Sequence, residues 1–116
     1  MADPKNIRVV AAEIERDGCF LITQRRARAI LPLLWEFPSG KVEEGESDEA
    51  ALRSELVERL GVQVAVGSLS MFIKHEYEDY VLDFCVYQCD LLTEDIQALR
   101  VHDWRWVSPL EMDQYE

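Results

Sequence analysis

The sequence predicts an α/β fold in which several strands accompany one helix. Alternating apolar and polar residues mark the strands, whereas residues 47–61 have helical periodicity between a serine and a glycine. The chain of 116 residues has 48% hydrophobic and 30% charged residues, which is ordinary for a globular protein with one core. We therefore expect a single domain spanning residues 1–116.

The net charge of −11 argues against general binding to a nucleic-acid backbone, which favours lysine and arginine. No basic stretch followed by a long apolar run opens the chain, and no apolar stretch is long enough to span a membrane. Cys85 and Cys89 would lie about 13 Å apart on one strand, too far to bridge. With Cys19 they are predicted to be small buried hydrophobes, so we expect a cytoplasmic protein without membrane contact.

The first half of the predicted sheet begins with a hairpin. Residues 6–15 predict a strand, Asp17-Gly18 is a strong turn signal, and residues 19–26 predict the returning strand. Pro32 bars regular structure from a predicted loop over residues 27–34, and a short strand follows around Trp35, Glu36 and Phe37.

The helix has clear start and stop signals. Ser47 is the predicted N-cap, and Gly61 is the predicted C-terminal stop. Leu52, Leu56 and Leu60 fall on one apolar stripe at about 100° per residue. This stripe predicts the face that packs on the sheet.

A neighbouring face of the same helix carries Glu55, Glu58 and Arg59, next to the acidic, glycine-bracketed loop 40–46. Two carboxylates on one turn suit a hard divalent cation, which takes oxygen ligands and bridges to phosphate oxygens. Charged residues at helical spacing are also typical of a solvated face. The residues alone leave both interpretations open.

Two or three further strands are expected after the helix. Residues 62–66 predict a strand that Gly67 ends, and residues 69–77 predict another. The long strand at residues 80–91 carries Asp83 between apolar neighbours, facing either a nucleotide base or, as we expect, an exposed edge. Also expected are a turn at Glu78-Asp79, a loop over 93–102, a strand at Trp106-Val107 and a helical turn at Ser108-Pro109.

The stretch from Gly40 to Val62 resembles the signature of the Nudix hydrolases. The matching residues are Gly40, Glu46, Glu55, Leu56, Glu58, Gly61 and Val62, and the preceding Trp35-Glu36-Phe37-Pro38 resembles the lead-in of the MutT-like branch. The similarity runs from about residue 7 to residue 110. It implies an α/β/α Nudix sandwich with a mixed β-sheet, here with the final C-terminal helix missing.

This resemblance implies a pyrophosphohydrolase of nucleoside di- or triphosphates, a MutT-like nucleotide clean-up enzyme that uses Mg²⁺ or Mn²⁺. In that role Glu55 is the central metal ligand or base, Glu58 is a second ligand, and the Ser39 carbonyl is a third. Arg25 and Lys41 would hold substrate phosphates. The implied partner is therefore a nucleoside phosphate and not a nucleic-acid polymer.

The signature is degenerate at two positions. Ser54 replaces its arginine, and Arg59 replaces the second member of its glutamate pair. A later metal-binding glutamate is also missing near Arg100. Arg59, four residues after Glu55, either neutralises a metal ligand or binds substrate phosphate itself.

Two further expectations follow from these departures. The alternative function is a catalytically inactive Nudix-fold module that binds nucleotide or a partner. The missing last helix also predicts an uncovered apolar strip on the sheet, and hence a homodimer.

Overall fold

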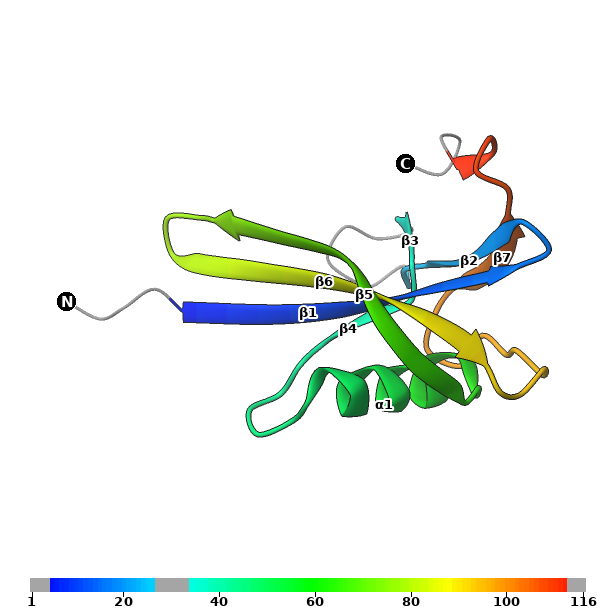
Figure 1. Ribbon diagram of the computed structural model, residues 1–116, viewed down its shortest axis with the longest axis horizontal. Helices are drawn as coiled ribbons and strands as arrows, with labels where there is room; N and C mark the ends of the chain where they lie inside the picture. Colours follow the sequence, from blue (N-terminus) through cyan, green and yellow to red (C-terminus); the bar gives the residue numbers. More distant parts are fainter. Residues whose placement is uncertain (1–4, 27–33, 113–116) are drawn as a thin grey trace.

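A computed structural model describes residues 5–26 and 34–112 (Figure 1). Most of the predicted loop over residues 27–34 therefore lies outside the described residues, as do residues 113–116. The elements are β1 (Lys5–Arg16), β2 (Cys19–Gln24), β3 (Trp35–Glu36), β4 (Ser39–Lys41), α1 (Asp48–Leu60), β5 (Val64–Glu76), β6 (Tyr80–Leu91) and β7 (Asp103–Val107).

The sheet is mixed, as predicted. Its strand order is β3-β2-β1-β6-β5, with β4 added to β1 and β7 added to β2. β1 and β6 run parallel, and the remaining pairs are antiparallel. β1 is long enough to pair with β4 and β6 along its length and with β2 at its end, so it joins the two parts of the sheet.

The β1–β2 hairpin forms at the predicted turn. Asp17 and Gly18 both have positive φ, 52° and 79°, which is the backbone of a type I′ hairpin turn. Such a turn follows the right-handed twist of the two strands. Its position sends β2 back along β1 and brings Arg25, just after β2, toward β4.

Helix α1 has the predicted ends. The Ser47 side chain accepts a hydrogen bond from the Ala50 N–H, and Gly61 takes a left-handed backbone with φ 67°. The leucine stripe is buried in the core against the sheet, and α1 lies on one side of β1, β4 and β5 (Figure 1). The buried residues of the helix are Ala51, Leu52, Leu56 and Leu60.

The predicted break at Gly67 is wrong, because β5 continues through it. A Cβ atom at Gly67 would lie 2.9 Å from the carbonyl oxygen of Gln88, so the glycine permits a close approach to β6. The pairing register with β6 shifts between Val66 and Leu69, and again before Met71. Gly67 therefore sits in an irregular stretch of one strand and does not separate two strands.

The predicted exposure of Asp83 is also wrong. Its strand β6 lies between β1 and β5, away from the sheet edge, and Asp83 is only 8% exposed. Arg8 Nη1 lies 3.9 Å from one carboxylate oxygen of Asp83. The other oxygen, Oδ1, is buried without a hydrogen-bond partner among the described residues. Asp83 thus belongs to the sheet interior beside Arg8.

The cysteine prediction is confirmed in part. Cys85 and Cys89 are buried and free, whereas Cys19 is only half-buried. Burial raises the pKa of the Cys89 thiol to about 11 and also raises the pKa of Cys85. None of the helices in the described ranges has the length and apolar character needed to cross a membrane.

Candidate functional site

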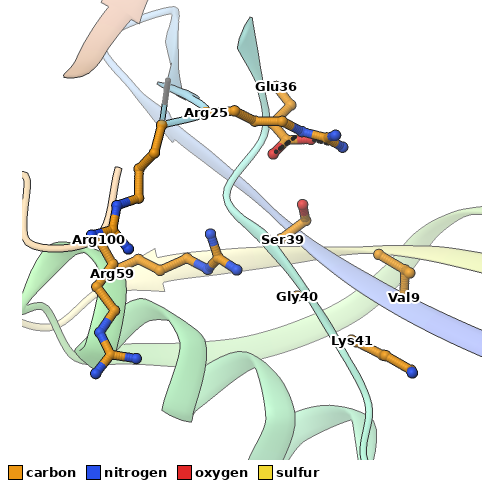
Figure 2. Close-up of a pocket in the computed structure, with 9 residues that line it drawn as sticks. Val9, Arg25, Glu36, Ser39, Gly40, Lys41, Arg59 and Arg100 are labelled. Atoms are coloured by element: carbon orange, nitrogen blue, oxygen red, sulfur yellow. Dashed lines mark hydrogen bonds and ion pairs between the residues drawn. The ribbon is translucent and has the colours of Figure 1, made fainter. Parts of the chain in front are cut away.

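A pocket of about 310 Å³ opens where β4, α1 and the ends of β2 and β3 meet (Figure 2). This volume is at the lower end of the range for small-molecule sites. Several elements far apart in sequence supply its walls. The lining residues are Val9, Arg25, Arg26, Glu36, Ser39, Gly40, Lys41, Arg59 and Arg100.

The pocket is strongly cationic although the chain is acidic. Five of the described lining residues are arginine or lysine, while the chain as a whole has a net charge of −11. The lining carboxylate, Glu36, is bound in bidentate fashion by Arg25, with distances of 3.0 and 3.1 Å. A hollow with this charge attracts an anion with several negative oxygens, such as a phosphate chain.

Glu55 is not among the lining residues, but it lies against two of them, Gly40 and Arg59. Arg59 Nε donates a 2.5 Å hydrogen bond to Glu55 Oε2, so the ion pair suggested by the helical spacing is formed. A Cβ atom at Gly40 would fall 2.2 Å from Cδ of Glu55. Gly40 therefore leaves the space that the Glu55 side chain occupies against β4, and Arg59 fixes its carboxylate from the other side.

Arg100 reaches the site through a backbone contact with α1. The N–H groups of Leu99 and Arg100 donate to the carbonyl oxygen of Arg59 over 3.0 and 3.1 Å. The side chain of Arg100 lies 3.8 Å from Glu58 Oε2. The loop before β7 thus brings a second arginine beside the C-terminal end of the helix.

The structure gathers most of the residues predicted for the site. Ser39 and Lys41 line the pocket from β4, Arg25 from just after β2, and Arg59 from α1. Ser39 has no left-handed backbone, so a serine fits this position. Glu58 is half-exposed on the flank of the helix and does not line the pocket.

Sequence reasoning missed Arg26, Glu36 and Arg100 as pocket residues. In the sequence, Arg100 drew attention only because a metal-binding glutamate of the family is missing near it. The positive charge of Arg100 is the signal that could have assigned it to a phosphate-binding pocket. Glu36 was predicted as part of a short strand, and its pairing with Thr23 of β2 brings it to Arg25. The pairing of strands distant in sequence was needed to assign these roles.

The described residues do not form a metal site by themselves. No group of three or more histidine, cysteine, aspartate or glutamate side chains in residues 5–26 and 34–112 is placed to hold an ion. Arg59 donates a hydrogen bond to Glu55, and Glu58 lies 3.8 Å from Arg100, beyond hydrogen-bond distance. Ligation of a divalent cation by Ser39, Glu55 and Glu58 stays a prediction.

A separate polar network ties the N-terminal end of α1 to the sheet. Arg8 donates two 2.7 Å hydrogen bonds to the Asp48 carboxylate, and the Tyr87 hydroxyl donates another of 2.5 Å. The Arg8 hydrogen bonds hold the pKa of Asp48 below its ordinary value, against the opposing effect of burial. The hydrogen bond to Asp48 raises the pKa of Tyr87. The network fixes how α1 lies on β1 and β6.

Comparisons with known proteins identify the family. A sequence model of the NUDIX domain matches residues 9–116. The chain is 39% identical over 111 residues to the CTP pyrophosphohydrolase of Escherichia coli (strain K12), covering 96% of this chain and 82% of that protein. It is 34% identical over 80 residues to the 8-oxo-dGTP diphosphatase of Proteus vulgaris, covering 68% and 71%.

A solved structure gives the same assignment for the fold. The crystal structure of the MutT protein from Methanosarcina mazei Go1 superposes with a TM-score of 0.85 at 22% identity, covering 100% of this chain and 86% of that one. The predicted Nudix fold with a mixed sheet is thereby confirmed. With its signature residues on β4 and α1 and a domain match over nearly its whole length, the chain belongs to the NUDIX family, in its MutT-like branch.

Proposed function

We propose that this chain is a Nudix-type pyrophosphohydrolase of nucleoside di- or triphosphates. The observation that carries the proposal is the cationic pocket of about 310 Å³ beside Glu55, which suits a phosphate chain. The similarity to a CTP pyrophosphohydrolase and to an 8-oxo-dGTP diphosphatase supports the same substrate class. A nucleoside triphosphate is the substrate we propose first.

The chain's own residues supply a consistent set of roles. Water attacks a phosphorus atom, a new P–O bond forms, and the bond to a bridging oxygen breaks, which yields pyrophosphate and a nucleoside monophosphate. Arg25, Lys41 and Arg59 offset the charge that develops on the phosphoryl oxygens. Glu55 accepts the proton of the attacking water, because it adjoins the pocket and is held in place by Arg59.

Mg²⁺ or Mn²⁺ enters this proposal as part of the nucleotide salt that is the substrate. Mg²⁺ is commonly bound through one or two carboxylates together with substrate phosphates, and not by a cage of protein ligands. Glu55, Glu58 and the Ser39 carbonyl are the protein oxygens that we propose for such a bound salt. The cation would add charge stabilisation to that of the arginines.

A second candidate function is a nucleotide-binding module without turnover. The observation that favours it is the 2.5 Å hydrogen bond from Arg59 to Glu55, which occupies the carboxylate that catalysis needs. In this case the cationic pocket would still bind the phosphate chain. The two candidates agree on the ligand and differ on the reaction.

Release of products from a nucleotide panel tests the choice. The purified chain is incubated with CTP, dCTP, dGTP, 8-oxo-dGTP and ATP, with Mg²⁺ or Mn²⁺, and pyrophosphate and monophosphate are measured. Release from at least one nucleotide, lost in Glu55→Gln, supports the hydrolase. Thermal stabilisation by the same nucleotides without release from any of them would establish the binding module instead.

Three finer points belong to the same proposal. We propose a cytoplasmic location, since free thiols persist in a reducing compartment. We propose no nucleic-acid polymer as a partner, since the net charge is −11. We also propose a homodimer formed through β5, whose apolar side chains Leu69, Met71, Phe72 and Ile73 are about half exposed at the sheet edge.

A further inference from the structure

We propose that Arg59 and Arg100 form an arginine clamp that binds the phosphate chain directly, so that a nucleoside polyphosphate binds this protein without a divalent cation. The inference rests on the proposed function for its substrate class. It concerns which groups of the protein offset the negative charge of that substrate. The guanidinium groups of the clamp would offset the phosphate charge, which a metal ion held by carboxylates would otherwise offset.

The first support is that the fold places the two arginines together. The Arg100 N–H donates to the Arg59 carbonyl oxygen over 3.1 Å, which fixes the start of each side chain relative to the other. Both residues line the same pocket as Ser39 and Lys41 of β4, and Figure 2 shows their side chains leaving neighbouring positions and pointing in different directions. Each guanidinium group at this hollow can donate to oxygens of one phosphate chain.

The second support is that both guanidinium groups keep donors for a ligand. The hydrogen bond to Glu55 uses Nε of Arg59, and no hydrogen bond joins its terminal nitrogens to another described residue. Arg100 is 3.8 Å from Glu58, beyond hydrogen-bond distance, and its side chain is 64% exposed. As far as the described residues are concerned, an incoming phosphate therefore meets N–H groups on both arginines without breaking a tight contact.

The third support is the balance of charge at the site. Arg59 stands where the Nudix signature has a glutamate, and Arg100 lies near where its later glutamate is missing, so both residues add positive charge to the pocket. Each change disfavours a bound cation and favours a bound anion. The two positive charges act on the same pocket and in the same direction.

Calorimetric titration of the full chain in EDTA tests the clamp. CTP and inorganic triphosphate are the probes, and both should bind the wild-type chain without added metal. Arg59→Ala and Arg100→Ala should each weaken binding by about tenfold, the scale of a lost hydrogen bond to a charged group. Binding that needs Mg²⁺ in the wild-type chain would overturn the proposal.

Arg53→Ala is the matched control, because it removes the same charge from the same helix. Arg53 is exposed and lines a different hollow with Val57, Gln63 and Leu92. It should leave the affinity for both probes within twofold of wild type. An equal loss in Arg53→Ala and Arg59→Ala would reduce the effect to overall charge and refute a clamp. Arg59→Gln, with a longer side chain than alanine, repeats the test if the alanine variant does not fold.

The results separate this inference from the proposed function. Hydrolysis that requires Mg²⁺, with no nucleotide binding in EDTA, would refute the clamp and leave the hydrolase. Arginine-dependent binding in EDTA with no turnover of any nucleotide would support the clamp and refute the hydrolase. Arginine-dependent binding together with turnover supports both.

Discussion

The backbone N–H of Arg100 donates to the carbonyl oxygen of Arg59 over 3.1 Å, although the two residues lie on opposite sides of β5 and β6 in sequence. The contact satisfies a carbonyl at the C-terminal end of α1, where the helix itself supplies no partner. It also brings two arginines to one pocket in an acidic chain. The charge of the candidate site therefore depends on a loop docking against a helix end.

Reversing the charge of both arginines should create a cation site. We expect the double variant Arg59→Glu with Arg100→Glu to bind Mn²⁺ at least tenfold more tightly than wild type, because two repulsive charges become attractive ones. Electron paramagnetic resonance of free Mn²⁺ during titration measures this affinity. Arg53→Glu with Arg105→Glu changes the net charge equally at exposed residues that do not line the pocket and serves as the control. An equal gain in Mn²⁺ affinity in both double variants would contradict a cation site that is local to the pocket.

Gly40→Ala should displace Glu55 without unfolding the protein. The new Cβ atom would fall 2.2 Å from both Cγ and Cδ of Glu55, so the Glu55 side chain must move while the backbone can stay. We expect nucleotide turnover to fall at least tenfold, while the free energy of unfolding changes by only about 1 kcal/mol. Initial rates and urea unfolding give the two quantities. Gly45→Ala at an open position is the stability control, since its positive φ strains alanine without touching Glu55.

Asp48→Asn should weaken the attachment of α1 to the sheet. The wild-type carboxylate accepts hydrogen bonds from Arg8 and Tyr87, and its replacement should cost about 2 kcal/mol of unfolding free energy. Glu49→Gln removes a charge from an exposed neighbour on the same turn and should cost about 0.5 kcal/mol or less. Urea unfolding at neutral pH measures both. Equal costs would show that the network adds nothing beyond the helix dipole.

The same carboxylate predicts how stability depends on acidity. The pKa of Asp48 is lower in the folded state than its ordinary value of 3.8. The contribution of its ionised carboxylate to the free energy of unfolding is therefore complete above about pH 3.8. It is lost as the pH falls below 3.8 through the lower folded-state pKa. Unfolding free energies measured from pH 6 downward should therefore converge for wild type and Asp48→Asn in acid. A constant difference throughout would contradict this origin.

The three cysteines should differ in their reaction with a thiol reagent. Burial raises the pKa of Cys89 to about 11 and raises that of Cys85, so both thiols stay protonated and shielded in the folded chain. Cys19 is only half-buried and should be alkylated first by N-ethylmaleimide. Peptide mass spectrometry after timed labelling reports each site. Labelling in urea is the control, where the three should react at similar rates.

Ile73→Lys should shift the proposed homodimer to monomer. Ile73 is 48% exposed on β5, the edge strand through which we propose that two chains meet. Val57→Lys is a matched control, because Val57 is equally exposed but lies on α1. Sedimentation velocity at micromolar to high micromolar concentration gives the oligomeric state. A wild-type chain that is monomeric throughout this range would refute the dimer.

Local signals in the sequence determined the helix and the hairpin. Ser47 and Gly61 specify the two ends of α1 through contacts within one turn, so neighbouring residues were enough to predict them. Asp17 and Gly18 specify the turn between β1 and β2 in the same way. The Glu55–Arg59 ion pair also follows from helical spacing.

The tertiary structure decided the features that depend on strands and loops distant in sequence. Gly67 ends no strand because β6 lies against it, and Asp83 is buried because β5 and β1 flank its strand. Arg100 joins the pocket because its loop docks on Arg59. The sequence alone determined where the helix, the turn and the Nudix signature lie, since each is set within a few residues. Which charges surround the phosphate pocket was decided only by folding, because side chains from separate elements meet there.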